Sequence, residues 1–370
     1  MKLIHAKEGM RFFSYSLKRR WKGIKRYDGT AQDICTSIID DCWNGRYFQT
    51  SAGHYCEFYT RDFGMCVPSL MKLGYSKKVQ QTLQYALNIF QKHGHVTTGI
   101  SPKQQAFDFP YYGPDSFAFL LWSLRHARAK PLVKRYQTFL QRMADEFQQQ
   151  VIAPDTGFVR EDKYFSSMRD YAKRKSSCYD NVMVAVVQRE LKKLGIRHEL
   201  AQHNLTSRIK QRYWTGEYFL DDLESKHIAG DANVVPFFLD LFTTKMQKQA
   251  FDVLHTEQLH KPYPLKYVQR KGTSMHVLEI LVPGWQHNAI WGHLGMMYLS
   301  LLKHSHHVLF EHVLEDYEHL VSGQGNFLEV LTHDGKPYKS LFYHTDVGMI
   351  WSSILLRLLK EHATIYRRKL

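Results

Sequence analysis

Apolar residues recur at helical spacing along almost the whole chain, and the alternation typical of strands is scarce. Short links, such as the glycine-containing turn at 73–76, separate some predicted helices, and longer loops rich in Gly, Pro and aromatic residues separate others. The periodicity predicts helices in six consecutive pairs, near residues 31–43, 62–73, 76–92, 115–128, 130–149, 178–194, 197–212, 231–242, 244–257, 286–303, 305–322 and 345–361.

The predicted helices alternate between two kinds. Those at 115–128, 178–194 and 286–303 are apolar on nearly every side, as buried helices are, whereas their neighbours in sequence have one polar side. A ring of buried helices inside a ring of amphipathic ones is an (α/α)6 barrel, and a stack of two-helix repeats has the same alternation. Because the chain has no fixed sequence period and its loops differ greatly in length, we predict the all-α (α/α)6 barrel.

Composition supports a single globular unit. Hydrophobic residues make up 44% of the 370 residues and charged residues 23%, which is unlike the composition of disordered chains. No linker divides the sequence. We therefore predict one domain over residues 1–370, in which residues 1–30 form a basic N-terminal extension.

The chain is strongly basic, with 50 Lys and Arg residues against 35 Asp and Glu residues and a formal net charge of +15. This charge is dispersed. Its densest run is at 18–26 (KRRWKGIKR), and no zinc-finger or other nucleic-acid-reading motif accompanies it. We expect a solvated basic surface and no nucleic-acid partner.

Cysteines and apolar runs bear on the compartment. The five cysteines are an odd number, widely spread and without a CxxC pair, which favours a reduced compartment. No apolar stretch reaches the length of a membrane span, and the first residues lack the apolar core of a signal peptide. We expect a cytoplasmic protein with no membrane partner.

Polar residues stand at or just before the start of nearly every predicted buried helix. In an α/α barrel these starts meet at one rim, so the side chains converge there. An Asp or Asn at a helix start is also an ordinary N-cap, which contributes about 1 kcal/mol. Capping does not explain the aromatic rings at the same ends, and rings beside carboxylates and amides indicate a sugar site. The polar residues are Arg61, Asp62, Asp115, Asp180, Asn181, Asp231, Gln286, His287, Asn288, His344, Thr345 and Asp346, and the rings are Tyr59, Phe63, Tyr111, Tyr112, Tyr179, Trp285, Trp291 and Tyr343.

Two carboxyl groups among these segments suit glycoside hydrolysis. That reaction needs one carboxyl group to protonate the leaving oxygen and another to activate water or attack the sugar. Asp115 precedes a very apolar predicted helix, where desolvation favours the protonated form of its side chain. Glu329 lies between apolar residues in the long loop before the last predicted helix, at the same rim. The two are the candidate acid and base.

Short motifs between about residue 55 and residue 361 resemble, in order, those of the six-hairpin glycosidases. The likeness is greatest to alkaline/neutral invertases and to the amylo-α-1,6-glucosidase domain of glycogen debranching enzymes. Residues 59–63 (YTRDF) resemble the aromatic-x-Arg-Asp segment of this family, and residues 286–291 (QHNAIW) resemble its Tyr-Gln-Asn-Gly-x-x-Trp-Pro segment. Asp115, followed by a helix that contains Trp, resembles the general acid of the family, and Glu329 resembles the catalytic base of its terminal motif.

The resemblance implies an inverting glycoside hydrolase that cleaves an O-glycosidic bond of a small glucoside or oligosaccharide, without a metal or a cofactor. Asp115 is expected to protonate the glycosidic oxygen while Glu329 deprotonates a water that attacks from the opposite face. The residues expected to bind sugar hydroxyls or to stack on the sugar are Tyr59, Arg61, Asp62, Asp180, Gln286, His287, Trp291 and His344.

Three other functions stay open. A sugar isomerase or epimerase on the same barrel would use histidines for proton transfer, and His287, His293 and His344 are its candidates. A lyase acting on an acidic polysaccharide fits the basic charge. A sugar-binding protein without catalysis fits the departures from the family pattern, such as Gly292 where the family has Pro. The histidine-rich segment 304–307 is expected at a helix end, where cations are favoured, and not in a zinc site.

Overall fold

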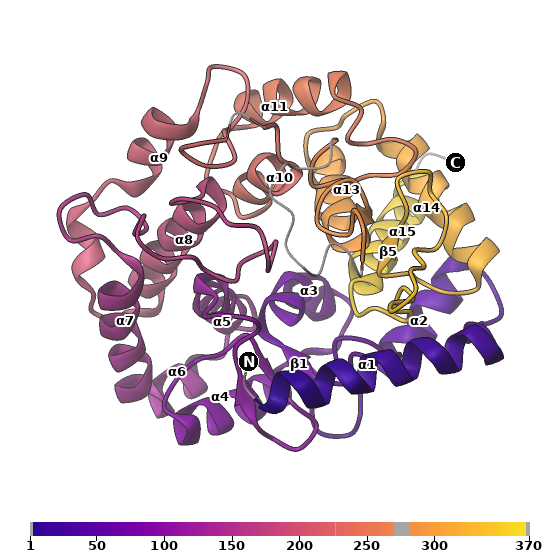
Figure 1. Cartoon of the computed structure of the whole chain (residues 1–370), viewed down its shortest axis with the longest axis horizontal. Helices are drawn as coiled ribbons and strands as arrows, with labels where there is room; N and C mark the ends of the chain where they lie inside the picture. Colours follow the sequence, from indigo (N-terminus) through magenta and orange to yellow (C-terminus); the bar gives the residue numbers. More distant parts are fainter. Residues whose placement is uncertain (1–2, 226, 270–281, 368–370) are drawn as a thin grey trace.

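The fold is a ring of helices inside a second ring of helices (Figure 1). The computed structural model describes residues 3–225, 227–269 and 282–367. In this part of the chain the inner ring consists of α3 (Thr60–Lys72), α5 (Pro114–His126), α8 (Cys178–Leu194), α10 (Gly230–Phe238), α13 (Gly292–His304) and α15 (Ser352–Arg367). The outer ring consists of α2 (Ala31–Asp41), α4 (Ser76–His93), α7 (Gln137–Val151), α9 (Leu205–Tyr213), α11 (Thr244–Thr256) and α14 (Phe310–Gln324). The other helices are α1 (Leu3–Lys22), α6 (Lys130–Arg135) and the 3₁₀ helix η1 (Glu199–Gln202).

The inner ring is closed. Each inner helix packs against the next inner helix along the chain, and the last one, α15, packs against the first one, α3. Helices α5 and α8 are buried on nearly every side, as their apolar patterns predict, whereas outer helices such as α7 bury one side only. The arrangement is the predicted (α/α)6 barrel.

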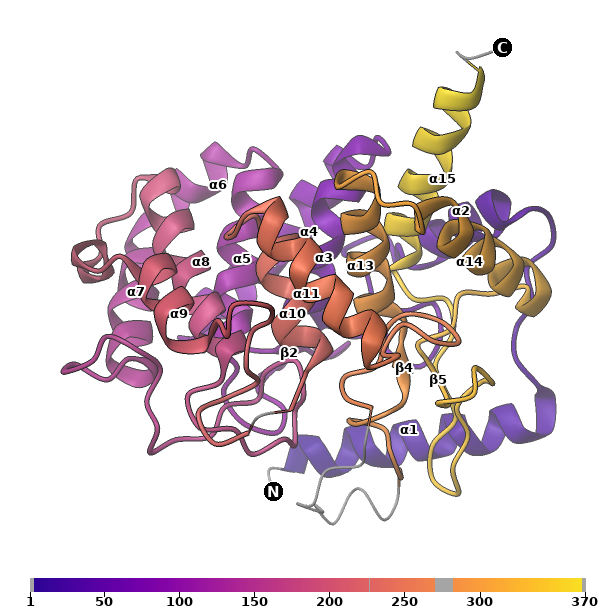
Figure 2. The ribbon, with the colours of Figure 1, turned by 90° about the horizontal axis from the view of Figure 1, so that it is seen from above.

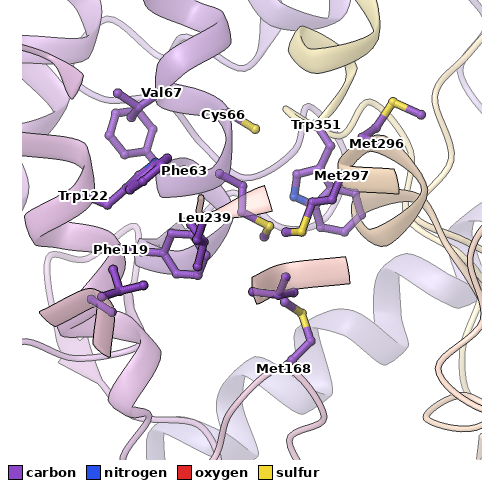
Figure 3. Close-up of a cluster of buried hydrophobic side chains, with 14 of the residues drawn as sticks. Phe63, Cys66, Val67, Phe119, Trp122, Met168, Leu239, Met296, Met297 and Trp351 are labelled. Carbon is purple, nitrogen blue, oxygen red and sulfur yellow. The ribbon is translucent and has the colours of Figure 1, made fainter. Parts of the chain in front are cut away.

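The interior of the barrel is filled by apolar side chains from several inner helices (Figure 3). Phe63 of α3, Phe119 of α5 and Met297 of α13 belong to one cluster there, together with Trp351 just before α15. All four side chains are buried. Packing of this kind holds the inner helices, and therefore their N-terminal ends, in fixed positions.

Short strands lie at the end of the barrel where the inner helices begin. Strands β1 and β4 lead directly into α3 and α13, so they set the direction in which two inner helices start. Strand β2 pairs antiparallel with both β1 and β3, and β4 pairs antiparallel with β5. The strands are β1 (Phe58–Tyr59), β2 (Gly99–Ile100), β3 (Ala106–Phe107), β4 (Ile290–Trp291) and β5 (Val330–Leu331).

Two predicted helix starts are wrong. Helix α13 begins at Gly292 and not at 286, and α15 begins at Ser352 and not at 345. Residues 290–291 form β4, whose backbone pairs with β5, and Val347 forms a bridge with Leu328. The apolar residues in these segments match helical spacing, but their backbone hydrogen bonds go to neighbouring extended segments.

Two other predicted helices are interrupted. The segment predicted as one helix at 130–149 is divided at Tyr136 into α6 and α7. The segment predicted at 197–212 contains η1 and then α9, which starts afresh after Asn204. The Asn204 side chain accepts a hydrogen bond from the backbone N–H of Ser207, so it acts as an N-cap inside the predicted helix.

The basic segment at 1–30 contains helix α1, which lies across the loop end of the barrel (Figure 2). Arg19 of this helix donates a hydrogen bond to the carbonyl oxygen of Thr345 at 2.7 Å. After the helix, the carbonyl oxygen of Lys25 accepts a hydrogen bond from the side chain of Asn326, also at 2.7 Å. The segment is therefore bound to loops that carry predicted site residues.

In the part of the chain that the structure describes, no helix combines the length and the apolar character needed to cross a bilayer. The five cysteines are free thiols, and four of them are buried. The barrel is therefore held together by packing and hydrogen bonds rather than by disulfides.

The contact between α3 and α5 can be tested at Gly64. A Cβ added at Gly64 would lie 2.7 Å from the Cβ of Phe119, so Gly64→Ala is expected to lower the free energy of unfolding by about 1–3 kcal/mol. Gly323→Ala is the matched control, because Gly323 lies in α14 with no atom near the added methyl group. It should leave the stability unchanged or raise it by up to about 1 kcal/mol. Chemical denaturation measures both changes, and equal midpoints for the two variants would contradict the close packing.

Candidate active site

A cavity of about 220 Å³ lies at the end of the barrel where the inner helices begin. Its lining comes from the start of α3, from β4 and the start of α13, and from the loops between helices. Aromatic rings make up much of its wall. The aromatic residues that line it are Tyr55, Tyr59, Phe109, Tyr171, Tyr267, Trp285, Trp291, Tyr343 and Trp351, and the polar ones are Thr50, Arg61, Asp62, Thr98, Asp170, Gln286, His293 and Glu329.

A single guanidinium group lies among three carboxylates at this cavity. Arg61, in the first turn of α3, has its Nη1 atom 3.3 Å from Asp115 Oδ2 and 3.8 Å from Asp170 Oδ1. Its Nε atom is 3.9 Å from Asp62 Oδ2. Within this group the negative charges outnumber the positive one. Because the group is largely buried, this imbalance favours protonation of at least one carboxylate.

Asp115 lies at the start of α5, behind Arg61. The nearby Gly113 packs so closely that an added Cβ would lie 2.5 Å from the carbonyl oxygen of Ser166. Asp115 is 1% exposed, and its Oδ2 accepts hydrogen bonds from the Tyr179 hydroxyl at 3.0 Å and from Arg61. Its Oδ1 has no hydrogen-bond partner among the described residues. Burial raises the pKa of Asp115, although Arg61 and Tyr179 oppose the rise. Asp115 is not part of the cavity lining.

Asp170 lines the cavity and is not among the site residues predicted from the sequence. It lies in the long loop between α7 and α8, with Oδ1 3.8 Å from Arg61 and 3.4 Å from the hydroxyl of Ser166. Burial raises the pKa of Asp170 to about 7, and the charge of Asp115 adds to the rise while Arg61 opposes it. The sequence signal at this position is an Arg169-Asp170 pair like the one at the start of α3. Helical periodicity gives no information about a residue in such a loop.

Glu329 lines the same cavity and immediately precedes β5. Its Oε2 accepts hydrogen bonds from the backbone N–H of Asp346 at 2.9 Å and from the hydroxyl of Tyr343. Burial and the neighbouring charge of Asp346 raise the pKa of Glu329 to about 8. The Glu329 side chain is therefore mostly protonated at pH 7.

Asp346 is buried beside Glu329 and stays ionised. Its carboxylate accepts hydrogen bonds from the backbone N–H groups of His54 and Tyr55 at 3.0 Å and 3.1 Å, and from the side chains of Ser51 and Arg19. Burial alone would raise the pKa of Asp346, but the His54 ring, whose Nδ1 lies 3.4 Å from Oδ1, lowers it to about 2 together with Arg19 and the hydrogen bonds. Burial also lowers the pKa of His54 to about 3, so this ring is neutral at pH 7. Arg19 of α1 therefore supplies the positive charge that faces Asp346.

The structure brings most of the predicted sugar-binding residues to the cavity. Those that line it are Tyr59, Arg61, Asp62, Gln286 and Trp291. Asp180, His287 and His344 do not line it. Asp180 instead accepts hydrogen bonds from the hydroxyl of Ser177 at 2.6 Å and from that of Ser167, which hold it in the first turn of α8.

Asp231, also singled out at a helix start, belongs to a buried ion cluster outside the cavity lining. Its Oδ2 lies 2.8 Å from Arg174 Nη1 and 3.6 Å from Arg169 Nε. Asp221 pairs with the same two arginines. The cluster connects α10 to the loop before α8 and to the loop between α9 and α10, so Asp231 has a structural role.

Among the three histidines considered for proton transfer, only His293 lines the cavity. Its Nε2 lies 3.1 Å from the hydroxyl of Tyr267. Burial lowers the pKa of His293 well below its usual value, so the ring is neutral. The histidine-rich segment 304–307 lies at the opposite end of α13 from the cavity. In the described ranges, no three metal-binding side chains of the His, Cys, Asp or Glu type come together as a site.

Comparison with solved structures tests the fold. No protein-family model matches the chain, and no curated protein matches it in sequence. The chain is similar to a rhamnosidase from Klebsiella oxytoca with rhamnose bound, with a TM-score of 0.64 and 11% identity over 90% of this chain. It is also similar to a glycosidase variant in complex with glucose, with a TM-score of 0.66 and 10% identity over 96% of this chain and 97% of the other. The barrel has the (α/α)6 fold of these structures.

A third structure with the six-hairpin fold is a GH63 mannosylglycerate hydrolase from Thermus thermophilus in complex with Tris and D-glycerate. Its TM-score is 0.61, with 11% identity over 89% of this chain and 100% of the other. The chain spans 63% of the length of the rhamnosidase. At such low identity the likeness establishes the fold, and the activity has to be argued from the site.

Arg19 is expected to influence Glu329 through Asp346. Arg19→Ala removes the positive charge that opposes Asp346, and the positive charge of Arg19 lowers the pKa of Glu329. The variant should therefore raise the pKa of Glu329 above about 8, whereas Arg19→Lys should largely preserve it. A ¹³C NMR titration of glutamate-labelled protein would measure this, with Glu329→Gln to assign the resonance.

Arg20→Ala is the matched control for this titration. Arg20 lies on the same helix and binds only the carbonyl oxygens of Ser340 and Leu341 among the described residues. Its loss should leave the pKa of Glu329 close to that of the wild type. An equal rise of the Glu329 pKa in both variants would show that this pKa depends on the docking of α1 and not on the charge of Arg19.

Proposed function

We propose that the protein is a glycoside hydrolase that cleaves an O-glycosidic bond of a small glucoside or oligosaccharide. The observation that carries this proposal is that Glu329 and carboxylates of the Arg61 group line one cavity with aromatic walls. The C–H faces of a pyranose pack well on such rings, and Asp62 and Gln286 offer oxygen and nitrogen atoms to its hydroxyls. The six-hairpin fold, which the chain shares with glycosidases, supports the same reaction class.

In the proposed reaction Asp115 is the acid and Glu329 the base. The bond between the anomeric carbon and the leaving oxygen breaks, and that oxygen takes the proton of Asp115. A water molecule attacks the anomeric carbon from the opposite face and gives its proton to the ionised form of Glu329, which is the minor form at pH 7, so the configuration inverts. Two observations support Asp115: burial favours its protonated form, and its Oδ1 has no other hydrogen-bond partner among the described residues. The proposed reaction needs no metal or cofactor.

Asp170 is a second candidate for the acid, because it lines the cavity and Asp115 does not. A sugar oxygen in the cavity would contact Asp170 directly, whereas Asp115 is buried and bound to Arg61 outside the lining. Both aspartates lie within reach of the same Arg61 atom, at 3.3 Å and 3.8 Å, so they are close alternatives in space. A pKa of about 7 leaves Asp170 partly protonated at neutral pH, which an acid requires.

The isomerase alternative has less support in the cavity. Proton transfer between carbon atoms of a sugar needs a group that can accept and release a proton near the operating pH. Of the histidines considered for this role, His293 alone lines the cavity, and it is buried and neutral. The groups of the cavity whose pKa values lie near neutrality are carboxylates, the pair that glycoside hydrolysis requires, and not the histidines on which the isomerase alternative rests.

The carboxylates can be tested by substitution. Wild-type protein is expected to hydrolyse at least one member of a panel that includes sucrose, trehalose and malto-oligosaccharides. Glu329→Gln and Asp115→Asn should each lower kcat by about 10²- to 10⁴-fold, because each removes a proton-transfer group. Asp170→Asn should lower it less. A larger loss of kcat in Asp170→Asn than in Asp115→Asn would assign the role of the acid to Asp170.

Asp162→Asn is the control for this panel, because Asp162 is exposed, pairs with Arg160 and does not line the cavity. It should retain full activity. A sugar that binds without being cleaved by the wild type would instead indicate a sugar-binding protein. Isomerisation abolished by His293→Ala but not by Glu329→Gln would indicate an isomerase. ¹H NMR of the first-formed anomer would test inversion.

With Asp170, the second candidate, as the acid and Glu329 as the base, the pH dependence of kcat/KM should be bell-shaped, with its maximum between about pH 7 and about pH 8. Asp170 and Glu329 have pKa values of about 7 and about 8, so a single proton on the pair is most populated between these values. The active form has the proton on Asp170 and the charge on Glu329, and it is the less populated of the two singly protonated forms because Glu329 has the higher pKa. At lower pH Glu329 is protonated and cannot act as the base, and at higher pH Asp170 is ionised and cannot act as the acid. Initial rates measured across this range would check it, and a maximum below about pH 6 would contradict the raised pKa values.

A further inference from the structure

The outer face of α1 carries a stripe of exposed apolar side chains. Met10, Phe13, Leu17 and Trp21 are spaced by three, four and four residues, so they lie on one side of the helix. All four are exposed, and Trp21 is 89% exposed. A single exposed apolar side chain needs no explanation, but a contiguous stripe of large ones indicates an interaction surface.

The loop at 340–342 extends this apolar surface. Leu341 is 69% exposed, and the ring of Phe342 lies 6.0 Å from the ring of Phe13. Arg20 fixes the loop against the helix by binding the carbonyl oxygens of Ser340 and Leu341. Seven of the ten large exposed apolar or aromatic side chains found in the described residues belong to α1 or this loop, namely Met10, Phe13, Tyr15, Leu17, Trp21, Leu341 and Phe342.

Basic side chains flank the stripe. Lys18 and Lys22 are exposed and form no ion pair with a described residue, whereas Lys25 pairs with Asp41. Together with Arg19, these three lysines line a second cavity of about 180 Å³ between α1 and the loops at 52–53 and 347–348. A cavity with four cationic side chains is suited to an anionic group such as a phosphate.

We propose that α1 and the loop at 340–342 dock the protein on an anionic lipid bilayer. An amphipathic helix with Trp, Phe and Leu on one face and lysines beside them lies in the interface of such a bilayer, with the rings among the acyl chains and the cations near the lipid phosphates. This is peripheral binding and needs no membrane-spanning helix. It departs from the expectation of no membrane partner, which rested on the absence of a spanning segment.

The charge of the protein favours a bilayer over a second copy of the chain as the occupant of this surface. In a symmetric dimer through α1, the same lysines of both copies would be brought towards each other. Each copy carries a formal net charge of +15, so the approach would be opposed by repulsion. An anionic bilayer instead attracts the same cations. Docking through α1 would hold the loop end of the barrel, and with it the carboxylate cavity, close to the lipid surface.

Vesicle sedimentation with the full chain tests this proposal. The protein should bind vesicles of phosphatidylcholine mixed with phosphatidylglycerol and should not bind phosphatidylcholine alone. The double variant Leu17→Ser and Trp21→Ala should lower binding by at least about tenfold, because it removes the apolar contact. Lys18→Glu with Lys22→Glu should cause a loss of similar size. The substituted side chains are exposed, so circular dichroism should show an unchanged fold.

Matched controls change the same kind of side chain elsewhere. Val308→Ser alters an exposed apolar residue between α13 and α14, and Lys103→Glu with Lys130→Glu changes the net charge equally. Both should retain binding. Three results would overturn the proposal: no binding to either vesicle, binding that survives the Leu17 and Trp21 substitutions, or a dimer in sedimentation velocity that those substitutions abolish.

Discussion

The site depends on the contact that closes the inner ring, where α15 meets α3. Trp351, just before α15, donates a hydrogen bond from its Nε1 to Asp62 Oδ1 of α3 at 3.0 Å, which joins residues 289 positions apart in sequence. Asp62 is next to Arg61, and the loop that leads to Trp351 also carries the partners of Glu329. Closure of the ring therefore brings both groups of carboxylates to one cavity. In an open stack of helix pairs they would lie on different surfaces.

Burial has opposite consequences for two neighbouring carboxylates, because their partners differ. Glu329 and Asp346 both lie out of water beside the cavity, and burial alone would raise the pKa of each. Asp346 has a guanidinium and two backbone N–H groups directed at it, so it is ionised. Glu329 then lies next to that fixed negative charge, which helps to keep it protonated. Two neighbouring buried carboxylates thus have different protonation states at neutral pH because one has more partners than the other.

The helices could be predicted from the sequence, but the cavity could be predicted only in part. A helix buried on one side leaves a periodic apolar pattern, and a helix buried on all sides leaves a nearly continuous apolar run, so the alternation of inner and outer helices is readable. Helix starts are readable where a polar residue precedes an apolar helix, as at Asp115. They are misread where an extended segment also has apolar residues at helical spacing, as before Gly292 and Ser352. Asp170 and Tyr55 come from loops, whose path over the barrel depends on tertiary contacts that no local pattern encodes.

The difference between helices, which need only an apolar pattern, and loops, which depend on specific contacts, explains how the fold is shared with other structures at 10–11% identity. The inner ring needs only apolar side chains of suitable size at the right spacing, and many sequences meet that requirement. The cavity instead depends on individual atoms, several of which come from loops and from the segment that contains α1. Arg19 is one such residue. It reaches Asp346 from outside the barrel, and the charge of Asp346 adds to the effect of burial in raising the pKa of Glu329. For the proposed glycoside hydrolase, substrate preference is therefore expected to reside in the loops that line the cavity, because loops vary more freely than the helices they connect.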